Sequence, residues 1–373
     1  MIERQLQALI QRQWDSGKVI IVLGPRQVGK TTLLEHICKL NGDYLFLNGD
    51  DIDTQNRLEI NSGEQVKRLF AGQTTVFIDE AQRIKNIGLT LKIIHDRLKN
   101  IRLLVSGSSA LELGSNIIEP LTGRKWEYHL FPISWDELVQ HKTYWNALQQ
   151  LETRLIYGMY PEVVNQDGNE EQVLRQIAGS YLYKDLLNYH GIRKPDMLSK
   201  LLTALALQVG SEVSYNELAN TLRMDRATIE QYIGLLEQAF VVFRLQPFSR
   251  NLRNEISSSR KIYFYDNGIR NAIINNFNPL ALRADVGALW ENFLISERMK
   301  ANHYNQAYGR SYFWRTHAQQ EIDYIEEYDG QLHAYEFKWN PKAKAKFSKT
   351  FTDAYPDSET KVISKDNFEE FLK

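Results

Sequence analysis

The sequence predicts an α/β fold that begins with a parallel sheet covered by helices, and three observations lead to it. Apolar strand candidates alternate with helical patterns in the first third of the chain, a glycine-rich loop joins the first strand to a helix, and a later strand ends in two carboxylates. Strands that alternate with helices usually pair in parallel. At 373 residues the chain is too long for one ordinary core, so we expect two or three domains.

The strand candidates of the first third are short, apolar and rich in β-branched residues. They cover residues 19–24, 44–48, 75–79, 102–106 and 127–131. Helical patterns separate most of them, as the crossovers of a parallel sheet require. We therefore expect the first domain to span residues 1–140.

A phosphate-binding loop follows the first strand candidate. Residues 24–31 match the pattern G-x-x-x-x-G-K-[ST] at each specified position, between a predicted strand and a predicted helix. Loop N–H groups would converge on phosphates, Lys30 would reach the β- and γ-phosphates, and the Thr31 hydroxyl would ligate Mg²⁺. The residues expected to bind ATP are Gly24, Pro25, Arg26, Gln27, Val28, Gly29, Lys30, Thr31 and Thr32.

The strand candidate 75–79 ends in the pair Asp79 and Glu80, about fifty residues after the loop. In phosphate-loop NTPases the first acid of such a pair lies near Mg²⁺. The glutamate that follows commonly polarises the attacking water. We expect Asp79 to act beside the metal together with Thr31, and Glu80 to be the hydrolytic residue.

Two further polar features of this region each leave two interpretations open. Ser106 and Ser108 follow an apolar strand candidate. Either could sense the γ-phosphate and so belong to the ATP site, as in AAA-type NTPases, or could cap the next helix. Arg124 precedes the last strand candidate. It is either a catalytic arginine finger, acting in cis or in trans, or a solvated surface side chain.

Composition excludes several classes of protein. The formal net charge is −1, so nucleic-acid binding would need a local basic patch. The single cysteine, Cys38, excludes a disulfide framework and a cysteine-rich zinc site. No apolar stretch approaches the ~18 residues of a transmembrane helix, and the first residues lack the form of a signal peptide. We expect a cytoplasmic protein without a membrane partner.

Residues 141–255 are expected to form a helical region that ends in a winged helix. Within residues 211–247, Ser214 opens a short helix, Asp225 can cap the next one, and a strand candidate covers residues 241–245. Two helices, a tight turn and a hairpin are typical of winged helices. The basic residues are Arg223, Arg226, Arg244, Arg250 and Arg253, which Glu230 and Glu237 dilute. DNA binding and a packing or protein-contact role both stay open.

Residues 256–373 carry a spaced set of carboxylates. Glu291 lies on a predicted helix, Asp323 on a strand candidate, and Glu336 with Lys338 on the next strand. This pattern is that of PD-(D/E)xK nucleases, which have a restriction-endonuclease-like fold. Three carboxylates suit Mg²⁺, and the lysine would position the hydrolytic water. Ile322 stands where that motif has proline, and a plain ion pair across a strand is the alternative.

These elements together resemble a prokaryotic family of AAA-type ATPases whose C-terminal half is a domain of unknown function. The resemblance implies an ATPase domain, a winged-helix region and a nuclease-like end, without a settled cellular role. Ala81 and Tyr160 depart from the family's usual residues. The segments that carry the resemblance are 24–31, 78–82, 121–124, 157–162, 266–270, 289–293, 321–323 and 336–338.

Three functions are compatible with the sequence. The first is an ATP-hydrolysing switch or motor whose C-terminal modules engage DNA or RNA, with a homo-oligomer as a further expectation. The second is a nuclease gated by ATP, and the third is an ATP-controlled scaffold. Glu80 favours hydrolysis over mere nucleotide binding, whereas the near-neutral charge disfavours a processive DNA motor.

Overall fold

The computed structural model describes residues 2–60, 62–108, 121–187, 194–249, 260–316 and 318–373, with no side-chain detail for 180–187. The chain folds into two compact units. The N-terminal unit comprises Met1–Ile133 and Gln238–Phe240, and the C-terminal unit comprises Ser134–Glu237 and Val241–Lys373. Each unit is described by itself.

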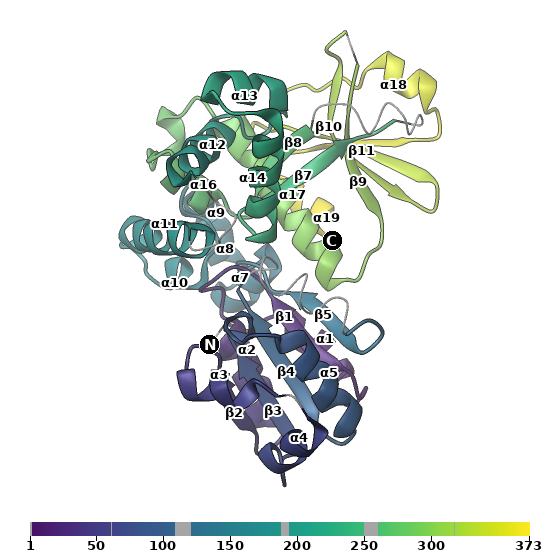
Figure 1. The fold of residues 1–373 in the computed structure, drawn as a ribbon. Helices are drawn as coiled ribbons and strands as arrows, with labels where there is room; N and C mark the ends of the chain where they lie inside the picture. Colours follow the sequence, from purple (N-terminus) through teal and green to yellow (C-terminus); the bar gives the residue numbers. More distant parts are fainter. Residues whose placement is uncertain (1, 61, 109–120, 188–193, 250–259, 317) are drawn as a thin grey trace. The chain divides into compact units, whose positions relative to one another are not determined.

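The N-terminal unit is built on a five-stranded, entirely parallel sheet of order β2-β3-β4-β1-β5 (Figure 1). Its strands are β1 (Val19–Leu23), β2 (Leu45–Asn48), β3 (Thr75–Asp79), β4 (Arg102–Gly107) and β5 (Lys125–His129). Its helices are α1 (Leu6–Arg12), α2 (Lys30–Leu40), α3 (Ile52–Leu58), α4 (Gly63–Leu69), η1 (Ala81–Arg83) and α5 (Ile87–Arg97). The expected alternation and the parallel sheet are confirmed, with strand ends within two residues of those predicted.

Strand order decides which residues meet at the edge of this sheet. β4 lies between β1 and β3, and its register places Ser106 beside Val22 of β1. Because all five strands are parallel, their carboxyl ends share one edge. The loop after β1, the acids after β3 and the serines after β4 therefore come together there. β1 and β3 are fully buried, as their apolar sequences predict.

The C-terminal unit contains a seven-stranded sheet of order β12-β11-β10-β9-β7-β8-β6. Its strands are β6 (Glu212–Val213), β7 (Val242–Pro247), β8 (Arg260–Phe264), β9 (Arg310–Arg315), β10 (Glu321–Tyr328), β11 (Gln331–Phe337) and β12 (Glu359–Ile363). Its helices are α7 (Trp135–Lys142), α8 (Tyr144–Gln149), α9 (Leu151–Tyr157), α10 (Pro161–Val164), α11 (Glu170–Leu187), α12 (Pro195–Leu207), α13 (Tyr215–Leu222), α14 (Arg226–Gln238), α16 (Asn267–Ile273), η2 (Leu280–Leu282), α17 (Val286–Tyr304), α18 (Lys349–Ala354) and α19 (Phe368–Leu372).

The first part of this sheet belongs to the region in which two helices and a hairpin were expected. α12, β6, α13, α14, β7 and β8 follow one another, and β8 pairs antiparallel with both β7 and β6. The side chain of Ser214 accepts a hydrogen bond from Glu217 N, and Asp225 accepts one from Thr228 N, so both predicted caps are present. Strands β6 and β8 were not predicted.

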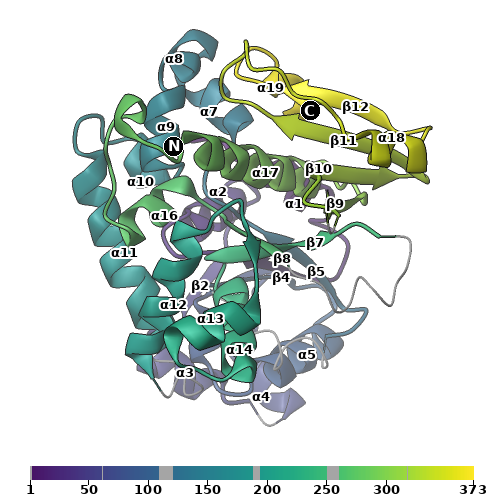
Figure 2. The same ribbon diagram turned by 90° about the horizontal axis from the view of Figure 1, so that it is seen from above.

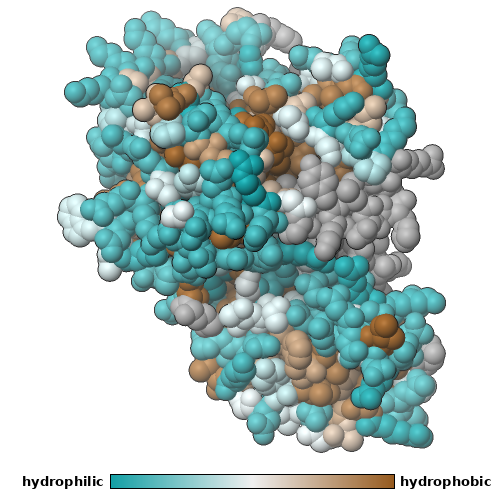
Figure 3. Space-filling view, turned by 90° about the vertical axis from the view of Figure 1, so that its left-hand side faces the viewer, coloured by the Kyte–Doolittle hydropathy of each residue, from teal (hydrophilic) through white to brown (hydrophobic). Residues whose placement is uncertain are grey.

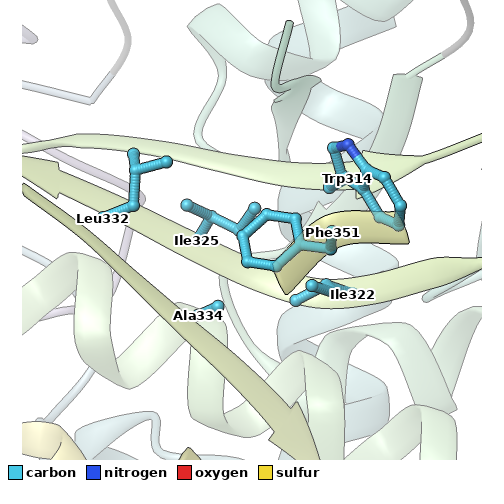
Figure 4. Packing of buried hydrophobic residues seen from close by; sticks show 6 residues of the cluster. All are labelled: Trp314, Ile322, Ile325, Leu332, Ala334 and Phe351. Atoms are coloured by element: carbon cyan, nitrogen blue, oxygen red, sulfur yellow. The ribbon is translucent and has the colours of Figure 1, made fainter. Parts of the chain in front are cut away.

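The second part contains α17, β9, β10, β11, α18 and β12 in chain order. The hairpins β9–β10 and β10–β11 are antiparallel, whereas β12 lies parallel to β11. Helix α17 runs alongside these strands and packs against β8 and β11 (Figure 2). Phe351 of α18 packs over the sheet among buried side chains of the three hairpin strands (Figure 4). These are Trp314, Ile322, Ile325, Leu332 and Ala334.

Two residue pairs join the two parts into one sheet. Gln246 and Pro247 of β7 lie in parallel register with Tyr312 and Phe313 of β9. The domain boundary expected at residue 255 therefore falls inside a continuous sheet, since β7 and β8 on either side of it pair with each other. The local patterns at residues 211–247 indicated a separate module, because the pairing of β7 with the distant strand β9 leaves no pattern in the local sequence.

On the face shown in Figure 3, hydrophilic residues dominate and hydrophobic ones form small, separate patches. Among the described helices, none has the length and apolar character that crossing a membrane demands.

Candidate functional site

The phosphate-binding loop connects β1 to α2 and has the backbone geometry that its glycines allow. Gly24 and Gly29 have φ of +155° and +92°. A Cβ atom on Gly24 would lie 2.1 Å from the backbone oxygen of Leu130, so only glycine fits there. Residues 24–29 form the loop, and Lys30, Thr31 and Thr32 form the first turn of α2.

Lys30 is buried and its ammonium group turns into the loop. Its Nζ donates to the backbone oxygens of Gly24 at 2.9 Å and Pro25 at 2.7 Å. The cation thus lies where the loop would wrap an anion. Loop N–H groups, the N-terminus of α2 and this ammonium together form a phosphate-binding cradle.

Asp79 connects the loop to two neighbouring strands. Its Oδ2 accepts a hydrogen bond from Thr31 Oγ1 at 2.8 Å, and its Oδ1 accepts one from Ser106 Oγ. Ser106 Oγ also accepts from the backbone N of Glu80, at 3.3 Å. The structure therefore brings together the expected metal-side acid, the Mg²⁺-binding hydroxyl and the expected sensor.

Glu80 follows β3 in the left-handed region, with φ of +47°. Its carboxylate accepts a hydrogen bond from Gln82 Nε2, and the same nitrogen lies 2.8 Å from Ser108 Oγ. Gln82 thus bridges the expected hydrolytic residue and the second serine after β4. Gln82 was given no role from the sequence, although it lies in segment 78–82, which contributes to the family resemblance.

Two other residues that support this site were missed. Gly49 follows β2, and a Cβ atom there would lie 2.3 Å from the backbone oxygen of Glu80. Arg4 is buried and donates to the backbone oxygens of Val28 at 2.7 Å and Phe131 at 2.6 Å, which holds the loop from behind. Their partners are distant in sequence, so local patterns could not reveal either role.

A second charged cluster lies in the C-terminal unit, around Glu291 of α17. Its Oε1 accepts hydrogen bonds from Lys261 Nζ at 3.0 Å and Tyr263 Oη at 2.5 Å, both from β8. Lys261, fully buried, also pairs with Glu321 of β10. Burial raises the pKa of Glu291 to about 7, and the negative charge of Asp323 adds to the effect against the attraction of Lys261.

Asp323, Glu336 and Lys338 meet on the β10–β11 hairpin. The register places Asp323 opposite Glu336, and Asp323 Oδ2 accepts from Phe337 N at 2.8 Å. Lys338 Nζ lies 2.9 Å from Glu336 and 3.8 Å from Asp323. Burial, followed by the charge of Asp323, raises the pKa of Glu336.

The expected metal trio Glu291, Asp323 and Glu336 stays a prediction, and the structure places lysines beside these carboxylates. In the described ranges, no three His, Cys, Asp or Glu side chains are grouped so that they could hold an ion. Lys261 and Lys338 neutralise the carboxylates, since burying clustered carboxylates without cations would be costly. Lys261 was not among the residues expected at this cluster, because it lies on β8, a strand that was not predicted.

Three family models match successive parts of the chain. An AAA domain matches residues 16–139, a domain of unknown function (DUF8612) matches 148–280, and another (DUF4143) matches 286–370. The match to an AAA domain agrees with the fold of the N-terminal unit and with its phosphate loop. Residues 16–139 therefore match an AAA domain and carry a phosphate-binding loop on a parallel sheet. The first two matches are separated by residues 140–147 and the last two by residues 281–285, while the domain limits expected at 140 and 255 stay predictions.

The chain is also similar to other proteins along most of its length. An uncharacterised protein of Mycobacterium tuberculosis is 28% identical over 345 residues, which cover 91% of this chain and 74% of that protein. One of Haemophilus influenzae is 26% identical over 292 residues, 72% of each chain. The fold is similar to that of the Walker-type ATPase of Pyrococcus abyssi, with a TM-score of 0.52 and 14% identity over 74% of this chain and 96% of that one.

Arg124 lies far from the phosphate loop of its own ATPase domain. It immediately precedes β5, and its backbone oxygen accepts a hydrogen bond from Val19 N at the start of β1. This is the amino-terminal edge of the parallel sheet, whereas the loop follows the carboxyl end of β1. Its Nε donates to Asp96 at 3.0 Å, and hydrogen bonds from His95 and then Arg124 lower the pKa of Asp96 to about 2. The placement does not support a role in cis, and a role across subunits stays a prediction.

The residues of the ATPase domain fit Mg²⁺ as an ATP-bound cofactor. Thr31 and Asp79 supply the oxygen ligands that Mg²⁺ prefers, and their side-chain oxygens already lie 2.8 Å apart at the loop.

The basic residues of the expected winged helix differ in their surroundings. Arg244 is held by Glu237 at 2.7 Å, Arg223 and Arg226 are exposed, and Arg250 and Arg253 lie outside the described residues.

Proposed function

We propose that this chain hydrolyses ATP in its AAA domain and acts as a switch or motor whose C-terminal unit engages a nucleic-acid partner. One observation carries the first half of this proposal. Asp79 accepts hydrogen bonds from Thr31 and Ser106 at the edge of the sheet where the phosphate loop begins, with Glu80 adjoining. A hydrolytic carboxylate beside a metal-side acid is the arrangement that phosphoryl transfer to water needs.

In this mechanism the loop N–H groups and Lys30 bind the phosphates and stabilise the charge that develops on them. Thr31 and Asp79 would hold Mg²⁺, and the ion would supply positive charge against that of the phosphates. Glu80 accepts a proton from the attacking water, and Gln82 fixes the direction of its carboxylate. Ser106 hydrogen-bonds to Asp79 and to the Glu80 backbone, so a change at Ser106 when the γ-phosphate leaves can reach both acids.

Two substitutions test ATP hydrolysis. Lys30→Ala should abolish binding of Mg·ATP, whereas Glu80→Gln should retain binding and lose turnover by roughly 10²–10⁴-fold, since an amide accepts no proton. Lys39→Ala, on the same helix and exposed, is the control for Lys30. Nucleotide binding and phosphate release are measured separately. Full turnover in Glu80→Gln would remove this residue from the mechanism.

The nucleic-acid partner is supported by element order and by the position of one lysine. Helices α12, α13 and α14 with strands β6, β7 and β8 occur in the order of a winged helix. The succession from α17 to β12 is the order expected of a nuclease-like core, and Lys338 lies beside Asp323 and Glu336, which supports this half of the proposal. The ATPase rate with and without DNA or RNA tests this half, because a coupled partner must change the rate.

An ATP-gated nuclease is the second candidate, favoured by Lys338 beside Asp323 and Glu336. Cleavage of DNA or RNA in Mg²⁺ or Mn²⁺ should then vanish in Glu336→Gln and Lys338→Ala while ATPase activity persists. Binding without cleavage would instead favour a scaffold, to which the pairing of Glu291 with Lys261 also points.

A further inference from the structure

A groove of about 490 Å³ opens beside Lys338 in the C-terminal unit. Its walls are the segment after β11 and the turn after β12. Lys338, Lys344 and Lys346 line it, together with Asn340, Ser364 and Asn367. None of the described residues that line the groove is acidic, so the groove is cationic.

The surrounding sequence is unusually basic for a chain of net charge −1. Residues 337–352 contain five lysines and no acidic residue. Lys344 and Lys346 are exposed, and no carboxylate in the described part of the chain pairs with either of them. Two lysines of the groove are therefore available to a ligand.

The opposite wall of the groove is fixed by its own hydrogen bonds. Asn367 Oδ1 accepts from Ser364 N at 2.8 Å, and Asn367 Nδ2 donates to the backbone oxygen of Val362 at 3.0 Å. Asn340 Oδ1 accepts from Lys342 N at 3.0 Å, which orders the start of the lysine segment. A ligand would thus meet a shaped polar wall on one side and lysine ammonium groups on the other.

We infer that this groove binds the phosphate backbone of a nucleic-acid strand and leads it to Asp323 and Glu336. Lysine is a point charge that suits phosphate oxygens without reading base edges. Trp339, which adjoins Lys338, is half-buried and offers no open platform for bases, because it is flanked by Trp290 at 5.2 Å and by Lys365 Nζ at 5.7 Å. The inference rests on the nucleic-acid half of the proposed function and gives that half a location.

This site predicts sequence-independent binding with a defined salt dependence. Each phosphate contact on a single strand contributes about 0.7 to the slope of log affinity against log salt. Replacing Lys344 and Lys346 should therefore lower the slope by about 1.4 and weaken binding roughly tenfold or more at low salt.

The test uses the full chain and a fluorescein-labelled 20-mer single strand, followed by anisotropy from 25 to 200 mM KCl without ATP. The double variant Lys344→Gln/Lys346→Gln is compared with Lys85→Gln/Lys200→Gln, which removes equal charge from exposed lysines elsewhere. We expect Lys344→Gln/Lys346→Gln to bind the strand more weakly and with a smaller salt slope than the wild type, and Lys85→Gln/Lys200→Gln to bind like the wild type. Both variants should retain the wild-type ATPase rate.

Three outcomes overturn the inference. Wild-type affinity and slope in Lys344→Gln/Lys346→Gln would place binding elsewhere, while nucleic-acid engagement itself would survive. No binding by the wild type, to single strand or duplex, would remove both the groove and the nucleic-acid half of the proposed function, leaving ATP hydrolysis intact. Displacement by polyglutamate as effective as by unlabelled strand would indicate an acidic protein ligand instead.

Discussion

The bridge formed by Gln82 makes a quantitative prediction for catalysis. Gln82 Nε2 donates to the carboxylate of Glu80 and lies 2.8 Å from Ser108 Oγ, so the amide restricts the direction in which Glu80 points. Gln82→Ala removes this restraint and leaves the phosphate loop untouched. We expect slower hydrolysis with nearly unchanged affinity for Mg·ATP.

The magnitude follows from the type of hydrogen bond. A bond to a charged acceptor contributes about 1.5–3 kcal/mol. Each 1.36 kcal/mol in the barrier changes the rate tenfold, so full loss of this bond corresponds to roughly 10- to 100-fold. Ser108→Ala removes only the second anchor of Gln82 and should cost a few-fold. Gln82→Glu should slow the reaction further, because a second carboxylate repels Glu80.

Single-turnover hydrolysis at saturating Mg·ATP is the appropriate assay, because slow product release cannot then hide a slower chemical step. Gln73→Ala, an exposed glutamine before β3, serves as the control. A single-turnover rate for Gln82→Ala within twofold of wild type, or above it, would refute the reasoning that Gln82 orients the base.

Three other predictions concern particular positions. If Arg124 acts across a subunit interface, the ATPase rate per chain should rise with protein concentration, and Arg124→Ala should remove that rise without changing ATP affinity; a concentration-independent rate argues against this role. Gly49→Ala should lower both the turnover and the melting temperature, because its Cβ would displace the backbone of Glu80, whereas Gly234→Ala, with open space in α14, should do neither. Glu291 has a pKa raised from 4.5 to about 7, so its contribution to stability is present at acidic pH and is lost as pH rises through 7. Between pH 5 and 8 the wild type should lose roughly 2–3 kcal/mol of unfolding free energy that Glu291→Gln retains, measured by urea denaturation, and parallel pH profiles would contradict the raised pKa.

The sequence was most informative where function depends on contiguous residues. The loop at 24–31 and the strand that ends in Asp79 were placed correctly, because strand, glycine-rich turn and helix each leave a local pattern. The structure adds the relation between them. Ser106 reaches Asp79 only because β4 lies between β1 and β3, and strand order is a property of the whole sheet.

The parts that sequence reasoning missed depend on contacts between distant segments. Arg4 contacts a backbone oxygen 127 positions away, and Lys261 pairs with a glutamate 30 positions along the chain. Neither lies in a recognisable motif. The residues of β8 do not alternate between polar and apolar, so the sequence pattern did not predict this strand. In the structure, Lys261 is as buried as its apolar neighbours. This strand brings Lys261 into ion pairs with Glu291 and Glu321.

The short pairing of β7 with β9 has a practical consequence for work on separate pieces of this chain. A fragment that begins after residue 255, or at the family limit near 286, would lose β7 and leave the edge of β9 without its neighbour. Phe313 O would then lack the hydrogen bond that Phe248 N donates at 2.6 Å. Unpaired strand edges with aromatic side chains such as Tyr312 associate with one another. Pieces cut at 134, which keep the whole sheet, should stay monodisperse where shorter ones aggregate.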